Sequence, residues 1–299
     1  HDLRDEISLG RENRHGRLFN FQMRNGELYP THQLGPITKV LGINRGNRFV
    51  SLVSMASKSK GLNEWIKKNK GEDYDLANYD FNQGDIVTTV LRCANGETVV
   101  LTHDCSLPRH YSRAYRVQGT KGLYMEDGES LFIEGLTKHE EGNWMHPAEE
   151  FEKYRDQFEH PLWKKYQTEG VHAGHGGMDF FMDVRMVYCL QNGLPLDMDV
   201  YDLAEWCCLA ELGSLSMDNG NCAVSFPDFT RGHWNDVKGY THAWASPEDE
   251  AATDAAAQAY TTAQKEAVVK HNLWSLYDAA AKAQGADKAA AEAAYRAAQ

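Results

Sequence analysis

Two β-prone runs joined by Asn95 and Gly96 constrain the fold more than any other part of the sequence. The runs are GDIVTTVLRC, residues 84–93, and ETVVLTHDC, residues 97–105. Asn-Gly is the dipeptide that best forms the tight turn between two antiparallel strands. The run RFVSLVSMAS precedes this hairpin, and three shorter runs bounded by glycines follow it up to residue 135. The sequence therefore predicts a largely antiparallel sheet.

Two amphipathic segments after this region predict helices. Residues 175–193 place apolar side chains on one face and end at Asn192-Gly193, which is a helix-stop signal. Residues 199–220 begin at Asp199, a good N-cap residue. Their helical periodicity predicts an apolar face made of Val200, Leu203, Cys207 and Ala210.

The other segments of the first 245 residues carry weaker signals. Residues 35–41 predict a short helix with Pro36 in its first turn. Residues 1–27 are polar and rich in Arg, Asn and Gly, so we expect a loop there. Residues 58–83 are charged and are expected to form a surface excursion.

The composition changes at Ser246, where an Ala-rich and strongly helix-forming stretch begins. Gly285 is expected to divide it into two helices. We therefore expect an α+β domain over residues 1–245 and a helical extension over residues 246–299. The predicted fold class is α+β: an open, largely antiparallel sheet with helices packed on one face, plus the Ala-rich tail.

Charge and hydropathy exclude some classes of function. The formal net charge of the 299 residues is −12, which repels a nucleic acid backbone. No apolar run reaches the length of a membrane span, so neither nucleic acid nor a membrane is expected as a partner. The chain begins at His1, and an export signal would have to lie upstream, so the compartment stays open.

The common cofactor and metal motifs do not appear in this sequence. Neither the GxGxxG fingerprint of dinucleotide-binding folds nor the P-loop pattern is present. His172, His175 and Asp179 could in principle hold a metal ion, but such spacings occur by chance, and we expect no metal site. With 43 acidic residues, sequence spacing selects no carboxylate pair for glycoside hydrolysis.

The stretch LYPTHQLGPI, residues 28–37, concentrates polar chemistry beside two rigid prolines. Pro30 restricts the backbone around Tyr29 and His32, so both side chains could point at one small polyol from a rigid loop. Histidine is the usual proton acceptor at neutral pH. From the pattern alone, a helix-capping Thr31 and a buried His32 form the plainer interpretation.

The same stretch closely resembles the family 109 glycoside hydrolases, which are NAD-dependent α-N-acetylgalactosaminidases of the glucose–fructose oxidoreductase and inositol dehydrogenase superfamily. The resemblance rests on YPTHQLGPI, an arginine twelve residues before its tyrosine, and INRG, together with HDLR, GHGGMDFFM, DVYDLAEW and FPDFTRG. It covers residues 1 to about 245. It implies the substrate domain of such an enzyme, without the Gly-rich fingerprint of the Rossmann domain that usually precedes it.

The resemblance implies a set of site residues. Arg17, Tyr29, Pro30, Thr31, His32 and Tyr111 match substrate-binding positions. His32 and Tyr111 are implied as catalytic, with His32 as the acid/base, and Tyr29 is also implied to touch the cofactor NAD. The implied route oxidises the sugar at C3, eliminates the glycosidic oxygen, adds water and reduces the ring again.

Three functions stay open at this point. The first is an NAD-dependent glycosidase that releases terminal α-linked N-acetylgalactosamine. The second is a sugar or polyol dehydrogenase of the same superfamily, and the third is an isolated substrate domain without catalysis. The expected partner is a small glycoside, and the superfamily implies a homo-oligomer that forms through the sheet.

Overall fold

The computed structural model describes residues 1–8, 16–137, 148–170, 174–239 and 247–282, and five single positions nearer the C-terminus (290, 293, 294, 296 and 297). The chain folds into two compact units. The first unit comprises His1–Phe158 and Met198–Tyr240, and the second comprises Glu159–Asp197 and Thr241–Gln299. Within the described part of the chain, no helix is both long and apolar enough to span a membrane.

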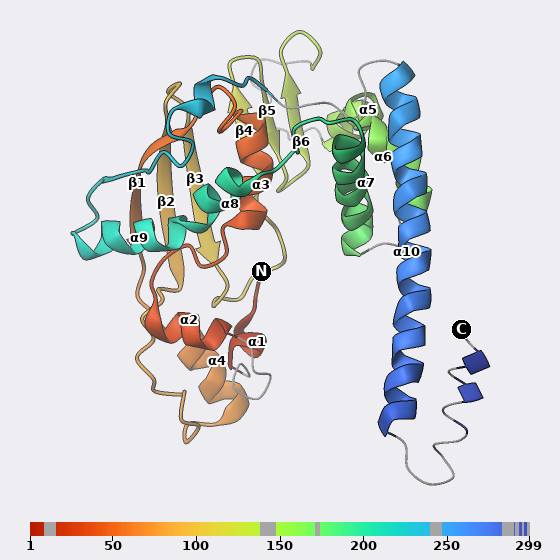
Figure 1. Ribbon diagram of the computed structural model, residues 1–299. Coiled ribbons are helices and arrows are strands. Elements are labelled where there is room, and N and C mark those ends of the chain that lie inside the picture. Colours follow the sequence, from red (N-terminus) through yellow and green to blue (C-terminus); the bar gives the residue numbers. More distant parts are fainter. Residues whose placement is uncertain are drawn as a thin grey trace. The chain divides into compact units, whose positions relative to one another are not determined.

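A four-stranded antiparallel sheet organises the first unit (Figure 1). Its order is β3-β2-β1-β7, with β1 at Phe49–Ala56, β2 at Ile86–Cys93, β3 at Thr98–Asp104 and β7 at Val224–Ser225. Between β2 and β3 the chain turns at Asn95-Gly96, where Gly96 has a φ of 101°, a conformation that favours glycine. The predicted hairpin and the largely antiparallel sheet are confirmed.

One face of this sheet carries the hydrophobic core. Leu52, Leu91 and Leu101 point from β1, β2 and β3 into a cluster that also contains Leu34, Trp206 and Leu209. The last three come from α3 (Thr31–Val40), α8 (Val200–Cys207) and α9 (Leu209–Asp218). The opposite face leaves apolar side chains exposed, namely Val53, Met55, Val90 and Val100. Helices therefore cover one face, as predicted.

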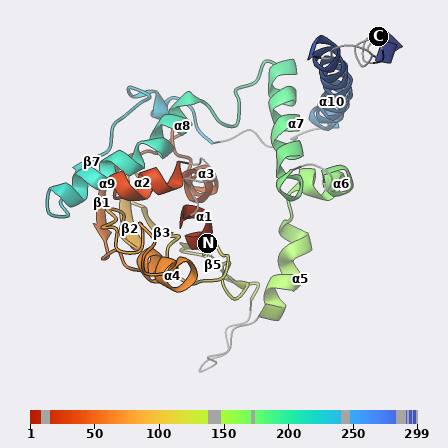
Figure 2. The ribbon, with the colours of Figure 1, turned by 90° about the horizontal axis from the view of Figure 1, so that it is seen from below.

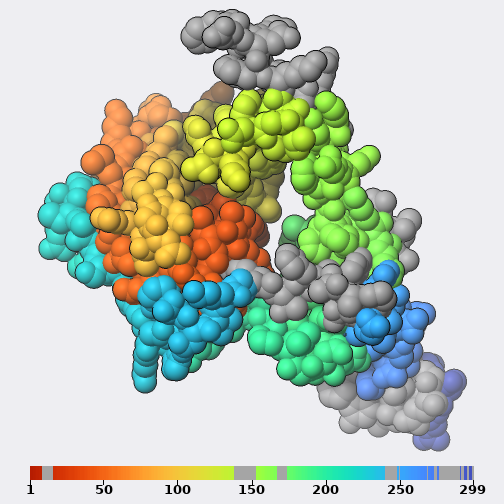
Figure 3. All heavy atoms as spheres, turned by 90° about the horizontal axis from the view of Figure 1, so that it is seen from above, coloured from red at the N-terminus to blue at the C-terminus, as the bar shows by residue number. Residues whose placement is uncertain are grey.

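The three short runs after the hairpin form a second antiparallel sheet. Its strands are β4 (Arg116–Gly119), β5 (Gly122–Met125) and β6 (Ser130–Ile133), in that order. None of the residues of these three strands is fully buried, and the yellow to yellow-green atoms of this sheet lie at the surface in Figure 3. Helix α5 (Ala148–Phe158) packs beside β6.

The predictions of a loop over residues 1–27 and of a surface excursion over residues 58–83 are wrong. Helices α1 (Arg4–Ser8), α2 (Arg17–Met23) and α4 (Gly61–Lys70) form there. Figures 1 and 2 show them gathered at one end of the sheet. Their sparse apolar side chains meet in a separate small core that includes Ile7, Leu18, Phe21, Leu62 and Ile66. Burial of these side chains stabilises helices that their polar composition does not indicate.

The predicted helix over residues 199–220 is two helices, and its predicted apolar face is wrong. Val200 and Leu203 are 69% and 53% exposed. The buried face of α8 instead contains Asp202, Glu205 and Trp206. The prediction of Asp199 as N-cap is correct, because its side chain accepts hydrogen bonds from two backbone N–H groups of the first turn.

The second unit is helical. It contains α6 (Pro161–Gly170), the 3₁₀ turn His175–Gly177, α7 (Met178–Gln191) and the tail helix α10 (Pro247–Lys282), which packs against α7. The Ala-rich helical tail is therefore confirmed, although Gly285 lies outside the described residues. The domain boundary between residues 245 and 246 stays a prediction.

Candidate functional site

The segment that contains Tyr29 and His32 begins a helix. Pro30 is the N-cap residue of α3, and its carbonyl accepts the backbone N–H groups of Gln33 and Leu34 at 3.1 and 2.9 Å. Thr31 and His32 therefore lie in the first helical turn, not in the expected loop, and the helix starts four residues earlier than expected. The φ of Pro30 is −78°, close to the helical value, which explains why a proline is compatible with this start.

Three of the predicted site residues form a continuous stack. The ring of Tyr29 lies against the imidazole of His32, with centroids 4.9 Å apart and planes inclined by 24°. The guanidinium carbon of Arg17, the first residue of α2, lies 5.4 Å from the centroid of the Tyr29 ring. Tyr29 is 52% exposed and His32 is also exposed, so the interpretation of His32 as a core residue is wrong. The stack presents a phenol and an imidazole to solvent, whereas the Arg17 guanidinium is partly buried and pairs with the Glu6 carboxylate at 3.3 Å.

Tyr111 belongs to a loop that follows β3. Its side chain is 61% exposed, and its ring packs edge-on against His1. Within the loop, the Arg109 guanidinium lies 3.3 Å from the Asp104 carboxylate and donates to the carbonyl of Ser112 at 3.0 Å. The expectation that Tyr111 shares one concave surface with the stack stays a prediction.

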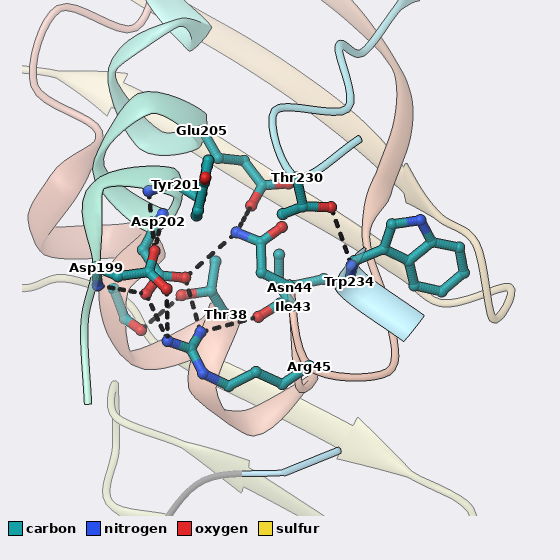
Figure 4. A network of polar contacts seen from close by, with 11 residues as sticks. Thr38, Ile43, Asn44, Arg45, Asp199, Tyr201, Asp202, Glu205, Thr230 and Trp234 are labelled. Carbon is teal, nitrogen blue, oxygen red and sulfur yellow. Dashed lines mark hydrogen bonds and ion pairs between the residues drawn. The ribbon is translucent and has the colours of Figure 1, made fainter. Parts of the chain in front are cut away.

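A buried polar network fixes the far end of α3 (Figure 4). Arg45 donates to both carboxylate oxygens of Asp202, at 2.8 and 2.9 Å, and Asn44 donates to Glu205 at 2.7 Å. Burial raises the pKa of Glu205 to about 8. The INRG turn, residues 43–46, is thereby attached to α8, which holds the connection between α3 and β1 in place.

A second set of buried polar groups lies at the residues directly before Tyr29 in the sequence. Gln83 donates to the carbonyl of Gly26 and accepts from its N–H, both at 3.0 Å, and so holds the chain between α2 and α3. Glu27 is fully buried, and the Thr89 side chain and the His103 backbone lie near its carboxyl group, although neither makes a hydrogen bond of standard geometry to it. Burial raises the pKa of Glu27 to about 8 and lowers that of the nearby His103 to about 4. Nothing in the local sequence signals these roles.

The described residues do not fit a complete site for a dinucleotide or for a metal ion. Both sheets are antiparallel, and in the described part of the chain no strand leads through a Gly-rich turn into a helix N-terminus that could hold a diphosphate. The resemblance assigns Tyr29 to the cofactor, but a single tyrosine does not make a complete dinucleotide site. No group of three metal-ligating side chains occurs among the described residues. His175 pairs with Asp179 at 3.0 Å, while His172 lies outside the described residues.

Comparison with known proteins agrees with the resemblance seen in the sequence. A glycosyl hydrolase family 109 protein of Phocaeicola vulgatus is 44% identical over 281 residues, which cover 89% of this chain and 50% of that protein. The alpha-N-acetylgalactosaminidase of Tannerella forsythia is 45% identical over 211 residues, which cover 71% of this chain and 44% of that protein. A family 109 protein of Stenotrophomonas maltophilia is 46% identical over 216 residues, which cover 72% of this chain and 46% of that protein.

The chain spans about half the length of these curated relatives. The family model that matches residues 7–236 is described as "Glycosyl hydrolase 109, C-terminal domain". This range contains the stack, the Tyr111 loop and the INRG turn. The chain therefore belongs to the family of glycosyl hydrolase 109 C-terminal domains.

Proposed function

We propose that this chain is the substrate-binding part of an α-N-acetylgalactosaminidase and binds a terminal α-linked N-acetylgalactosamine residue. The observation that carries the proposal is the stack of Arg17 with the exposed side chains of Tyr29 and His32 beside the start of α3. An exposed phenol and imidazole beside a guanidinium suit a sugar, because these groups can exchange hydrogen bonds with its hydroxyls while the exposed part of the aromatic rings contacts its ring carbons. The name of the Tannerella forsythia relative supports the choice of sugar.

The proposed roles follow from the chemistry of each side chain. Arg17 donates to hydroxyl oxygens and stabilises negative charge that develops on them. His32 takes or returns a proton at the sugar ring, and its stacking on Tyr29 restricts the orientation of the imidazole. Tyr111 supplies a second phenol from the loop after β3, as the resemblance implies. Pro30 and Thr31 shape the helix start that presents these groups.

NAD dependence of the active enzyme belongs to this proposal on the strength of the family resemblance. The residues described do not form a dinucleotide site, so we derive no reaction step through NAD. We also propose a homo-oligomer that forms through the sheet. Val53, Val90 and Val100 lie in one cross-strand row on its exposed face, and a second copy of this face could cover them.

The proposal is tested by titrating the chain with methyl α-N-acetylgalactosaminide and with the matching α-galactoside, followed by NMR. We expect shifts at residues 29–32 for the first sugar and weaker binding of the second. Turnover of an aryl glycoside with added NAD separates the open functions. Free sugar without net NADH indicates the glycosidase, and accumulating NADH indicates a dehydrogenase. Sugar binding without turnover indicates an isolated binding domain, and absence of sugar binding contradicts the proposal.

A further inference from the structure

Helix α3 contains a proline that removes one of its own hydrogen bonds. Pro36 lies inside the helix, in its second turn. Proline has no backbone N–H, so the bond that residue 36 would donate to the carbonyl four residues earlier does not form. That carbonyl belongs to His32, the proposed acid/base. The sequence thus opens a hydrogen-bond acceptor on the backbone of the residue whose position matters most for the proposed chemistry.

A tyrosine from another part of the chain supplies a donor to this carbonyl. The hydroxyl of Tyr115, 83 positions away, donates a hydrogen bond to the carbonyl oxygen of His32. Burial raises the pKa of Tyr115, which favours the protonated phenol that donates. The backbone of Tyr115 is itself fixed, because its N–H donates to the Glu126 carboxylate at 3.0 Å and its carbonyl accepts the Glu126 N–H at 2.8 Å.

The same stretch carries Tyr111, four residues before Tyr115. Between them, the Ser112 hydroxyl lies 2.5 Å from the Asp127 carboxylate and accepts the Ala114 N–H at 2.8 Å. Ala114 has a φ of 51°, in the left-handed region, so the chain makes a tight turn just before Tyr115. The loop is therefore held to the turn between β5 and β6 on one side and to α3 on the other.

We propose that Tyr115 is a positioning residue, which sets the loop carrying Tyr111 against the helix turn carrying His32. Pro36 is its complement, since without an N–H at position 36 the Tyr115 hydroxyl has no competing helical donor at the carbonyl of His32. This inference rests on the proposed function of His32 and Tyr111 in sugar binding. It goes beyond that function because it assigns roles to two residues that would not touch the sugar.

A double-mutant cycle of Tyr115→Phe and Pro36→Ala tests the proposal. Three quantities are measured on each protein: the free energy of unfolding in urea, the deuterium exchange rate of the amides of residues 110–115, and the dissociation constant of methyl α-N-acetylgalactosaminide. Tyr201→Phe is the control, because it removes a phenol hydroxyl from an exposed position of the same unit.

For Tyr115→Phe alone, we expect lower stability and faster exchange in residues 110–115. We also expect a dissociation constant about five- to tenfold higher, which corresponds to the loss of one ordinary hydrogen bond between the displaced Tyr111 and the sugar. The Pro36→Ala change introduces an N–H that can reach the carbonyl of His32. In the Pro36→Ala background, Tyr115→Phe should therefore cost much less stability. Exchange and sugar binding should remain impaired, because the link to the loop is still missing. Tyr201→Phe should change none of the three quantities.

Two results would overturn the proposal. Unchanged exchange in Tyr115→Phe would mean that the hydroxyl does not hold the loop. Recovery of sugar binding together with stability in the double variant would mean that Tyr115 acts on the helix alone. If the unsubstituted chain binds no sugar, the proposed function fails, whereas the exchange and stability measurements still decide whether Tyr115 and Pro36 are coupled.

Discussion

Arg45 and Asp202 lie 157 positions apart in the sequence and meet in a bidentate ion pair with N–O distances of 2.8 and 2.9 Å. Both side chains are buried, with 9% and 2% of their surface exposed. A buried carboxylate that loses its charged partner keeps most of its desolvation penalty, at a cost of about 3–5 kcal/mol. Among the described residues, Asp202 would retain only the hydrogen bonds that it accepts from the Asp199 N–H at 2.9 Å and from the Asn44 amide at 3.3 Å. The pair therefore makes the attachment of the INRG turn to α8 sensitive to substitution.

We expect Arg45→Ala to lower the free energy of unfolding by about 3–5 kcal/mol, measured by urea denaturation. Lys67→Ala is the control, since Lys67 pairs with Glu64 at 3.9 Å on the surface, and it should cost less than about 0.5 kcal/mol. Equal effects of the two substitutions would show that the buried pair contributes nothing special to stability.

Glu27 should make stability fall as the pH rises. Its pKa in the folded protein is raised from 4.5 to about 8 by burial. Below about pH 4 the carboxyl is protonated in both states. Between about pH 4.5 and about pH 8 the folded state keeps a proton that the unfolded state releases, so the free energy of unfolding decreases with pH, by at most about 1.4 kcal/mol per pH unit for this group.

The clearest window for this effect lies between pH 6.5 and pH 8. Burial lowers the pKa of His103 to about 4, which gives the opposite slope between that value and its ordinary 6.5. Glu205, with a pKa of about 8, contributes in the same direction as Glu27. We expect Glu27→Gln to flatten the urea-derived stability profile in this window, whereas Glu64→Gln, at an exposed carboxyl, should leave it unchanged. A Glu27→Gln profile as steep as that of the unsubstituted chain would contradict this assignment.

The fold could be predicted where local sequence signals agree with the observed burial of side chains. It could not be predicted where contacts with residues far away in the sequence determine which side chains are buried. Asn95-Gly96 and the β-prone runs beside it fix the central hairpin by local chemistry alone. On α8, periodicity selected Val200 and Leu203 for the buried face, but the structure buries Asp202 and Glu205. Burying these carboxyl groups requires Arg45 and Asn44, more than 150 positions earlier, and no local pattern reveals such partners.

In the candidate site, too, some residues could be proposed from the sequence and others could not. Arg17, Tyr29, His32 and Tyr111 could be named from motifs, because the spacing of these residue types carries the resemblance. The role proposed for Tyr115 could not be inferred from the sequence. It depends on a hydrogen bond to the carbonyl of His32, 83 positions earlier, and on the N–H that Pro36 lacks. Short polar helices such as α2 also escape sequence analysis, because each buries only a few side chains against other elements.

Gly61 should not tolerate a side chain. An alanine Cβ at this position would lie 2.1 Å from the carbonyl oxygen of Ser106 and 3.1 Å from the carboxylate of Asp85. Asp85 already accepts the N–H groups of Lys60 and Gly61 at the start of α4, so the backbone there has little freedom to shift. We expect Gly61→Ala to lower the free energy of unfolding by about 1–3 kcal/mol in urea. Gly16→Ala is the control, because nothing lies within 4 Å of its added Cβ and its φ is −76°.

The last prediction concerns His32 in the active enzyme. If its imidazole takes or relays the proton at the sugar ring, His32→Ala should lower kcat about 10²–10⁴-fold. His32→Gln keeps a hydrogen-bonding group without a titrating proton and should lower kcat nearly as much. Tyr29→Phe keeps the ring that stacks on His32 at 4.9 Å but removes the hydroxyl, so it should weaken sugar binding as well as the rate.

The measurement for His32 is kcat on an aryl α-N-acetylgalactosaminide with saturating NAD, together with exchange of the C2 proton of the sugar for solvent deuterium. Loss of both in His32→Ala, with the dissociation constant of the sugar changed little, indicates proton transfer by the imidazole. Loss of sugar binding alone indicates that His32 only shapes the stack with Tyr29. If His32→Ala keeps near-normal kcat and still exchanges the proton, His32 is not the base, and Tyr111 becomes the next residue to test, because its phenol is exposed on the loop that Tyr115 attaches to the same helix turn.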